Sequence, residues 1–427
     1  MLQSGEKTQI LFGSAHHTSA HWARVRAEVE QLVADVPLYA GRAASPDGEG
    51  DSPEAISAWL AAMPTVQKRD LRRGFPKSLV RRGTDLKAEM AKGAVEIIAT
   101  SGTTENRLQV LWEWTWWDPQ EREAMRLNRR IAELMPEHRP SFREAVLTTP
   151  VCGGATCHVG NLSREERTID GMLFLNQVAD PTHWGPAELE RMLAEWNDLR
   201  PDGVEADPAY LAALCRHAVR ANVQMHSPGF VTLTYELTTR GHKRAIRAAL
   251  GAAPLYALYG ATETGVLFME CGDGRLHHNT RHSHIELVDV GHGRGRVLVT
   301  TLGRTWMPLL RYDLGDLVKV AEGPCSCGRD DGGYLLERVE GRTNDALLLD
   351  ARLLTPAELD DAVDGASPQL EAWQLVREDG AFLLRTVGDG GGAAAEALSA
   401  LLGATVQARS EAALLPEGSG KYRLVKP

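Results

Sequence analysis

The sequence predicts an α/β protein with a large N-terminal α/β body, a β-rich subdomain within that body, and a small mobile α+β domain at the C-terminus. Short runs of β-branched and leucine residues alternate with segments of helical spacing, which is typical of α/β architectures. A flexible polar stretch at 341–345 precedes a last part of different composition. The chain has 427 residues, enough for two or three domains, and its 43% hydrophobic and 24% charged residues are normal for a globular protein.

Two helix starts share one signal, an aspartate followed by a proline at the first helical position. They lie at Asp118-Pro119 and Asp207-Pro208. The second helix carries Cys215 on its apolar face, so this thiol is predicted to be buried. Runs rich in β-branched residues or leucine predict strands at Val95–Ala99, Ile285–Val290, Val297–Leu302 and Leu347–Leu349.

The tryptophans Trp112, Trp114 and Trp116 alternate with other residues, beside Trp117. This period of two predicts a strand with one strongly apolar face. Such a face serves a core or an interface more often than a ligand-binding box.

We predict two domains, residues 1–340 and residues 341–427. In the second, Thr355 and Glu358 have the spacing of a capping box, which opens a helix. A hairpin follows, with strands Ala372–Arg377 and Ala381–Val387. A glycine-rich break at 388–392 then precedes a last helix. The polar stretch at 341–345 is the predicted hinge between the domains.

The composition excludes several functions. The net charge of −10 and the pI near 5.8 argue against nucleic-acid binding, because an acidic surface repels phosphates. No apolar run approaches the length of a membrane span, and the start of the chain lacks a secretory apolar segment, so we expect a cytoplasmic protein. Six cysteines are too few for a disulfide scaffold, so a cysteine cluster would bind metal or take part in catalysis.

A run of hydroxyl residues around a glycine directly follows the first predicted strand, which we expect to be buried. Such a loop can donate several hydrogen bonds to phosphate oxygens, since glycine allows the backbone to approach closely. It is not a Walker A loop, because no lysine follows. Taken alone, it is equally consistent with a polar turn. The run is Thr100-Ser101-Gly102-Thr103-Thr104.

Four further blocks follow in order. They are Tyr259-Gly260-Ala261-Thr262-Glu263, Arg311-Tyr312-Asp313-Leu314-Gly315-Asp316, Gly341-Arg342-Thr343-Asn344-Asp345 and Gly420-Lys421-Tyr422-Arg423. From about residue 95 to the C-terminus, the chain resembles the adenylate-forming superfamily of acyl-CoA synthetases, peptide-synthetase adenylation domains and luciferases. Glu270-Cys271 and the Cys325-to-Arg329 segment are most similar to its phenylacetate-CoA ligase branch.

The resemblance implies a role for each block. The loop at 100–104 would hold the β- and γ-phosphates of ATP, and Glu263, which follows Thr262, would bind Mg²⁺. Lys421, on the C-terminal lid domain, would bridge the α-phosphate and the attacking carboxylate. The residues expected around the nucleoside are Tyr259 with Gly260 for adenine, Asp316 for the ribose hydroxyls, and Arg342 for ribose or phosphate. The alternative for Asp316, Arg342 and Lys421 is an ordinary solvated surface position.

The chain also departs from the family pattern. The phosphate loop continues with Glu105, which is unfavourable beside a triphosphate unless it faces a cation, and Arg107 could supply positive charge. The hinge aspartate is replaced by Asn344. Ala351 stands where relatives have a glycine beside the pantetheine tunnel, so a methyl group there puts the use of CoA in question.

Three cysteines and one histidine form a second candidate site. Three thiolates and an imidazole suit tetrahedral Zn²⁺ in a closed structural site, and related ligases carry a similar Glu-Cys and Leu-His element. The alternative is a set of reduced thiols without metal, and His278 could replace His277 if the register differs by one. The set is Cys271, His277, Cys325 and Cys327.

The remaining histidines lie in polar stretches, so we expect each to be solvated: His16, His17, His21, His282, His284 and His292. His158 follows Cys157 where the family builds its acyl pocket, and is a candidate substrate contact.

These features predict an ATP-dependent, AMP-forming ligase that adenylates an aromatic or short-chain carboxylic acid and transfers it to a thiol, CoA by default. An alternative keeps the adenylation, of a carboxylate or of a small oxyanion such as nitrite, and passes the product to an amine or a carrier protein. A non-enzymatic nucleotide-binding protein is a third reading, but such a protein needs neither Glu263 nor Lys421.

Overall fold

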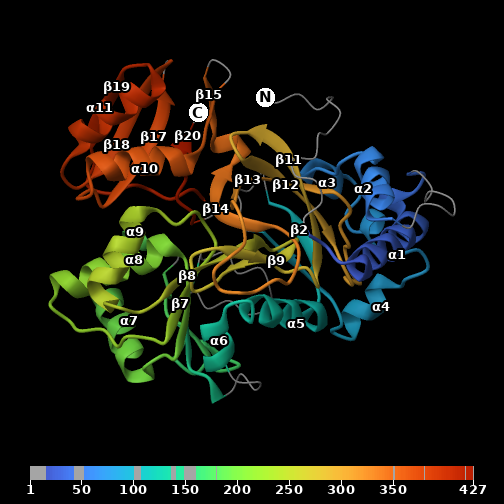
Figure 1. Cartoon of the computed structure of the whole chain (residues 1–427). Helices are drawn as coiled ribbons and strands as arrows, with labels where there is room; N and C mark the ends of the chain where they lie inside the picture. Colours follow the sequence, from blue (N-terminus) through green and yellow to red (C-terminus); the bar gives the residue numbers. More distant parts are fainter. Residues whose placement is uncertain are drawn as a thin grey trace. The chain divides into compact units, whose positions relative to one another are not determined.

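The structure is a computed structural model, and it describes residues 16–42, 52–100, 107–135, 141–148, 160–178, 180–349, 352–378, 380–418 and 420–426 (Figure 1). The chain divides into two compact units. The first comprises Met1–Thr100, Leu108–Asn128 and Gly260–Val339, and the second Ser101–Arg107, Arg129–Tyr259 and Glu340–Pro427. Both contain helices and sheet, which confirms the predicted α/β class.

The first unit combines short helices with an antiparallel sheet. Its strands lie in the order β11-β12-β13-β14-β10-β9. Their bounds are β9 Gly265–Glu270, β10 Leu276–His278, β11 Ser283–Gly291, β12 Arg294–Thr301, β13 Tyr312–Val320 and β14 Leu335–Arg342. The helices are α1 Ser19–Asp35, α2 Pro53–Ala62, α3 Lys68–Arg73, α4 Leu86–Ala91 and α5 Trp114–Met125. The strands predicted near 285–290 and 297–302 are confirmed as β11 and β12.

The second unit contains a mostly parallel sheet in the order β8-β7-β6-β3-β5-β4, with only β4 antiparallel to its neighbour β5. The strands are β3 Glu144–Leu147, β4 Thr168–Ile169, β5 Met172–Phe174, β6 Gly203–Ala206, β7 Phe230–Leu233 and β8 Leu255–Ala261. The helices are α6 Arg129–Leu134, α7 Pro186–Leu199, α8 Pro208–Arg220 and α9 Arg240–Leu250. Loops at the carboxyl ends of such parallel strands are where α/β proteins place their ligand-binding residues.

Helix α8 begins as the sequence predicts. The Asp207 side chain caps it by accepting hydrogen bonds from the backbone N–H groups of Ala209 and Tyr210, and Pro208 occupies the first turn. Cys215 is fully buried, as predicted. This cap fixes a carboxylate at the end of β6, directly beside the start of the helix.

The C-terminal residues of the second unit build their own small core around a sheet in the order β19-β18-β17-β20. The Thr355–Glu358 capping box and the predicted hairpin are both confirmed. The elements are β15 Leu347–Leu349, β16 Arg352–Leu354, α10 Pro356–Ala366, β17 Ala372–Glu378, β18 Ala381–Val387, α11 Gly391–Leu402, β19 Val406–Ser410 and β20 Val425–Lys426.

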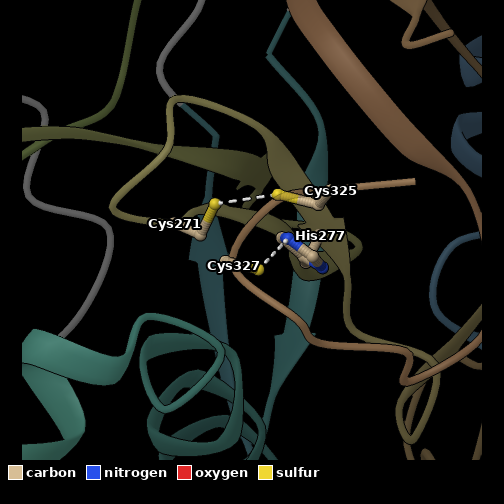
Figure 2. A group of neighbouring side chains, drawn as sticks. All are labelled: Cys271, His277, Cys325 and Cys327. Carbon is tan, nitrogen blue, oxygen red and sulfur yellow. Dashed lines mark hydrogen bonds between the residues drawn. The ribbon is translucent and has the colours of Figure 1, made fainter. Parts of the chain in front are cut away.

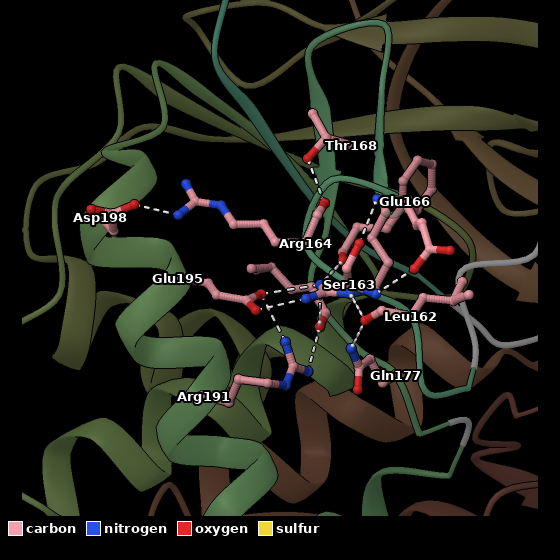
Figure 3. A network of polar contacts seen from close by, with 12 residues as sticks. Leu162, Ser163, Arg164, Glu166, Thr168, Gln177, Arg191, Glu195 and Asp198 are labelled. Carbon is pink, nitrogen blue, oxygen red and sulfur yellow. Dashed lines mark hydrogen bonds and ion pairs between the residues drawn. The ribbon is translucent and has the colours of Figure 1, made fainter.

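A buried arginine anchors the chain around β4 and β5 to helix α7. Arg167 donates hydrogen bonds to both carboxylate oxygens of Glu195, at 3.0 and 2.6 Å, and to the carbonyl of Phe174 at 2.6 Å. Arg191 binds the same carboxylate (Figure 3). Burial acts to raise the pKa of Glu195, but the hydrogen bonds from the two arginines hold it below its usual value. The carboxylate is therefore charged at neutral pH and fixes this segment.

Three local predictions are wrong. Helix α5 begins at Trp114, so Pro119 lies inside the helix and Asp118 does not cap it. The tryptophan run is not a strand either, because β2 (Gln109–Trp112) ends at its first tryptophan. Long-range contacts decide this start, because the Trp116 indole N–H donates to the carbonyl of Leu302. The strand before residue 100, β1 Glu96–Ala99, is not buried throughout. In the described part of the chain it pairs only with β2, and it is partly exposed.

Among the described residues, no helix has both the length and the apolar character that crossing a membrane requires.

Candidate active site and metal centre

Lys421 is held at the carboxyl end of the parallel sheet in the second unit. Its Nζ donates a hydrogen bond of 2.7 Å to the carbonyl oxygen of Tyr235, which follows β7. On either side, the Gly420 carbonyl accepts a bond from Tyr210 and the Tyr422 N–H donates to Glu236 at 2.8 Å. The backbone around the lysine is thus fixed by one side chain from the first turn of α8 and one from the loop after β7.

Two carboxyl groups, that of the buried Asp207 and that of the partly buried Glu236, lie close to this lysine. Burial raises the pKa of Asp207 to about 7, although the charge of Lys421 opposes the shift. Burial, together with the charge of Asp207, raises the pKa of Glu236 well above its usual value. Tyr235 itself has a φ of 75°, a left-handed conformation that costs free energy in a non-glycine residue. Strain and shifted pKa values cluster at functional sites, so this loop region is a candidate for chemistry.

Glu263 lies in the first unit, in the turn between β8 and β9. Its side chain is buried, and Oε1 accepts a hydrogen bond of 2.9 Å from the Tyr312 hydroxyl. The guanidinium of Arg304 donates to the Glu263 backbone carbonyl. The carboxylate is therefore oriented by β13, and the backbone of Glu263 is held by the segment after β12. One oriented carboxylate suits Mg²⁺, which takes most of its other ligands from phosphate and water.

The block before Glu263 requires a glycine. A Cβ atom at Gly260 would lie 2.3 Å from the backbone oxygen of Gly265, which no relaxation of a side chain could relieve. Tyr259, on the same strand, is buried. Thr262 lies in the turn and is partly exposed. This turn is thus fixed closely against β9.

Asp316 lies in a bulge of β13. The register between β12 and β13 shifts so that Arg296 pairs with Leu317 while Leu298 pairs with Asp313. Gly315 has a φ of 78° there, and Asp316 itself is largely buried. Bulges redirect side chains beside active sites, which is consistent with a carboxylate presented to a ligand.

Arg342 is the last residue of β14 and is exposed. Three residues later, Asp345 accepts a hydrogen bond of 2.7 Å from Arg423. Burial raises the pKa of Asp345, while the charges of Arg423 and Arg342 oppose the shift. The predicted hinge is therefore tied to the segment that carries Lys421.

Thr100 closes the base of the predicted phosphate loop. Its N–H donates to the Leu108 carbonyl at 2.8 Å, and its Oγ1 accepts from the Leu108 N–H at 3.0 Å. The hydroxyl keeps its own proton for donation. The other residues of the loop, Ser101, Gly102, Thr103 and Thr104, lie outside the described residues, as do Glu105, Cys157, His158 and Ala351.

The three cysteines and His277 converge in the first unit (Figure 2). Cys271 follows β9, His277 lies on β10, and the other two cysteines come from the segment between β13 and β14. The Sγ atoms of Cys271 and Cys325 are 3.6 Å apart, and Cys327 Sγ is 3.3 Å from His277 Nε2. All four ligand atoms lie within 4.8 Å of one another.

This geometry fits a tetrahedral zinc ion. With Zn–S bonds of ~2.3 Å, two sulfur ligands lie roughly 3.8 Å apart, close to the observed Cys271–Cys325 separation. Burial and the neighbouring thiols raise the pKa of Cys325 to about 12, and burial lowers the pKa of His277. The Cys325 thiol is therefore protonated at neutral pH without a cation, and a bound metal ion would displace this proton.

The histidine predictions are partly wrong. His16 and His292 are exposed, as expected, but His284 is buried on β11, and His17 and His21 lie against it. His282 is half-buried and bonded to Glu123. Polar neighbours in sequence did not reveal this burial, because β11 is covered on both faces along its first five residues.

Sequence reasoning also missed the side chains that position the two charged candidates. These are Asp207, Tyr235 and Glu236 around Lys421, and Arg304 beside Glu263. Asp207 was visible only as a helix cap. Nothing in the local sequence relates it to a lysine more than two hundred residues later.

Comparisons with known proteins give a consistent result. No protein-family model matches the chain. Two curated relatives are phenylacetate-coenzyme A ligases. The one from Thermus thermophilus is 27% identical over 222 residues, which cover 48% of this chain and 48% of the relative. The one from Pseudomonas putida is 24% identical over 357 residues, covering 80% of this chain and 74% of the relative. The first match thus spans about half the length of the Thermus protein.

Solved structures extend the likeness to almost the whole chain. A crystal structure of 2-hydroxyisobutyryl-CoA ligase in the postadenylation state, in complex with R3-HIB-AMP, has a TM-score of 0.68 at 16% identity. The match covers 96% of this chain and 89% of that ligase. At this identity the likeness concerns the fold. The chain thus shares the fold of that ligase along nearly its full length, and it is similar in sequence to two phenylacetate-coenzyme A ligases.

Proposed function

We propose that the protein is an ATP-dependent, AMP-forming ligase for an aromatic or short-chain carboxylic acid. A carboxylate oxygen of the acid attacks the α-phosphorus of ATP, pyrophosphate leaves, and an acyl-adenylate forms. The thiol of CoA then attacks the acyl carbon, its proton is lost and AMP leaves. The observation that carries the proposal is that a chain of this fold keeps both Glu263 and Lys421, each held in place by buried neighbours.

Each ordered block has a role in this reaction. Lys421 neutralises charge that develops between the α-phosphate and the attacking carboxylate. Asp316 accepts hydrogen bonds from the ribose hydroxyls, and Tyr259 stacks on adenine. Arg342 contacts ribose or phosphate. Glu263 binds Mg²⁺, which offsets charge on the phosphates, and Thr262 before it is a further catalytic residue of this proposal. The loop from Thr100 to Thr104 holds the phosphates that leave.

The same proposal divides the chain into an N-terminal domain, 1–340, and a lid domain, 341–427. Four partly exposed arginine–carboxylate pairs join the C-terminal residues to α8 and α9, and polar contacts of this kind are released more readily than an apolar core. The pairs are Arg216–Glu371, Arg220–Glu371, Arg240–Asp361 and Arg244–Asp364. The lid can therefore deliver Lys421 for adenylation and withdraw it for the second step.

The thiol cluster binds one structural Zn²⁺ in this proposal. Three cysteines and His277 complete a tetrahedral set and leave no position for substrate. The described cysteines, Cys215 included, are all free thiols. Reduced thiols favour the cytoplasm as the compartment, where disulfides rarely persist.

Exchange of labelled pyrophosphate into ATP tests the first step across a panel of carboxylic acids and nitrite. We expect exchange that depends on one class of carboxylic acid and on Mg²⁺. An absence of exchange with every acid, under conditions where ATP binds, would contradict the proposal and favour a nucleotide-binding protein.

The acceptor needs a second assay, because Asn344 replaces the hinge aspartate and Ala351 replaces a glycine. These departures favour the alternative in which an amine or a carrier-protein thiol receives the acyl group. The enzyme is incubated with ATP, the acid that gives the fastest exchange, and CoA, and the products are identified by mass spectrometry. Thioester formed at the rate of adenylation supports CoA, whereas adenylate that accumulates beside intact CoA supports the alternative.

A further inference from the structure

Three histidines of the first unit form a cluster apart from the candidate sites above. His17 directly precedes the cap residue of α1, His21 lies in the first turn of that helix, and His284 is the second residue of β11. One ring nitrogen of each lies within 4.8 Å of those of the other two. The rings of His17 and His21 stack with centroids 3.9 Å apart, and His21 Nε2 is 3.1 Å from His284 Nδ1.

Hydrogen bonds do not satisfy the ring of His17. Both ring nitrogens of His17 are buried, and neither has a hydrogen-bond partner among the described residues. A buried polar group without a partner destabilises the folded protein, since it gives up its hydrogen bonds to water. Packing of imidazole rings alone leaves this cost uncompensated, whereas a ligand that accepts a lone pair from the ring would offset it.

Burial favours the neutral form of the three rings. Burial, reinforced by His21, lowers the pKa of His17 to about 3. Burial and the charge of Arg24 lower the pKa of His21 to about 4, although a hydrogen bond with the Thr280 backbone acts to raise it. Burial also lowers the pKa of His284 well below its usual value. Neutral imidazoles keep a free lone pair at neutral pH.

We propose that His17, His21 and His284 bind a divalent first-row transition-metal ion, with Zn²⁺ as the natural probe. Imidazole nitrogens suit zinc, copper, nickel and iron. In a tetrahedral site with Zn–N bonds of ~2.0–2.1 Å, two nitrogens lie about 3.3 Å apart. The His21–His284 separation is already close to this value, and a ring nitrogen of His17 lies within 4.8 Å of both.

This site is distinct from the thiol cluster. Successive residues of a strand point to opposite faces, and His277 and His278 are neighbours on β10. His277 faces the thiols, while the ring of His278 lies with its centroid 5.9 Å from that of His17. His278 Nε2 is bonded to Ser283 at 3.0 Å, so this ring flanks the histidine site without belonging to it.

An ion at this place would fasten the start of α1 to β11. Two of the ligands come from the N-terminal end of the helix and one from the edge strand of the sheet. Because the ligands are far apart in the chain, the binding free energy of the ion contributes to the folding free energy of the unit. The site is therefore structural in this proposal, and its loss should affect stability more than turnover.

Metal titration of the full chain tests the proposal. Protein stripped by a chelator is titrated with Zn²⁺ in a calorimeter, and the folded state of each variant is checked by circular dichroism. We expect the double variant His17→Ala/His21→Ala to bind one equivalent of Zn²⁺ fewer than the wild type. Cys325→Ser/Cys327→Ser should retain the equivalent that the histidines bind. His16→Ala, an exposed neighbour of the same residue type, is the matched control and should bind as the wild type does.

Cobalt distinguishes the two ligand sets. In Cys325→Ser/Cys327→Ser, we expect bound Co²⁺ to show visible d–d bands without the thiolate charge-transfer band of a cysteine site. Metal binding that is abolished in this cysteine variant and unchanged in the histidine variant would overturn the proposal. If the double histidine variant fails to fold, His17→Gln replaces it, and undiminished binding by His17→Gln would overturn the proposal equally.

Discussion

Lys421 Nζ donates a hydrogen bond to the carbonyl oxygen of Tyr235, 2.7 Å away, at the end of the parallel sheet. The acceptor is a neutral backbone group in a strained left-handed residue, and two carboxyl groups with raised pKa values lie nearby. The lysine is thus kept close to the strand ends without a full ion pair. A substrate carboxylate or phosphate can therefore compete for its charge.

Replacing this lysine tests its role. Lys421→Ala should lower the rate of acid-dependent pyrophosphate exchange by roughly 10²–10³-fold, because it removes a charge aimed at the transition state. The matched control is Lys426→Ala, which removes a lysine from β20 that pairs with Glu417. Exchange at the wild-type rate in Lys421→Ala, with the control also unaffected, would show that the lysine has no part in adenylation.

The raised pKa of Asp207 predicts a dependence of stability on pH. The folded protein keeps a proton on this group up to about pH 7, whereas the unfolded chain releases it near pH 4. The folded state thus binds more protons in this window, and the free energy of unfolding should fall as pH rises from about 4 to about 7. Asp207→Asn keeps the helix cap and should flatten this fall, by an amount on the order of a few kcal/mol.

Urea denaturation at several pH values within this window measures the effect. Asp202→Asn serves as the comparison, because hydrogen bonds with Arg143 lower the pKa of Asp202, which gives the opposite slope at lower pH. Parallel pH profiles for wild type and Asp207→Asn would mean that Asp207 is already ionised in the folded protein.

The thiol cluster predicts a structural metal. Cys327→Ser should reduce the zinc content by about one equivalent and lower the melting temperature, while turnover at low temperature changes little, because a closed site contributes its binding free energy to folding. Cys215→Ala is the control: it removes a buried thiol that lies outside the cluster, so its zinc content should not change. Protein purified without chelator that contains no zinc would contradict the site.

The arginine–carboxylate pairs that join the C-terminal residues to α8 and α9 predict a dependence on salt. Glu371→Gln weakens the bonds with Arg216 and Arg220, so the rate of adenylation should fall several-fold and depend less on ionic strength. Glu378→Gln removes a similar pair with Arg385 inside the β17–β18 hairpin and should have no such effect. Equal rates and equal salt profiles for both variants would argue against a role for these pairs in placing Lys421.

Local signals predicted those elements whose cause is local. The Thr355 capping box, the Asp207 cap and the hairpin of β17 and β18 depend on residues a few positions apart, and all three are confirmed. The start of α5 depends on a partner far along the chain, since Trp116 is held against the segment at Leu302. No signal near Asp118 could have shown this.

The candidate sites follow the same rule. The thiol cluster could be predicted across a long separation, because cysteine and histidine have few other reasons to occur together in a reduced protein. The histidine cluster could not, since His17 and His21 lie in a polar stretch and only the fold brings them to His284. Likewise, Asp207 and Glu236 acquire raised pKa values from burial, which their sequence neighbours do not indicate.

The paired hydrogen bonds between Thr100 and Leu108 have a consequence for the tolerance of the segment between them. They join the two ends of the segment. The β1–β2 hairpin therefore offsets the entropy cost of closing this loop, and that cost depends on the length of the loop more than on its residue types. Substitutions between these two residues, at Glu105 or Asn106 for example, should therefore leave the hairpin intact.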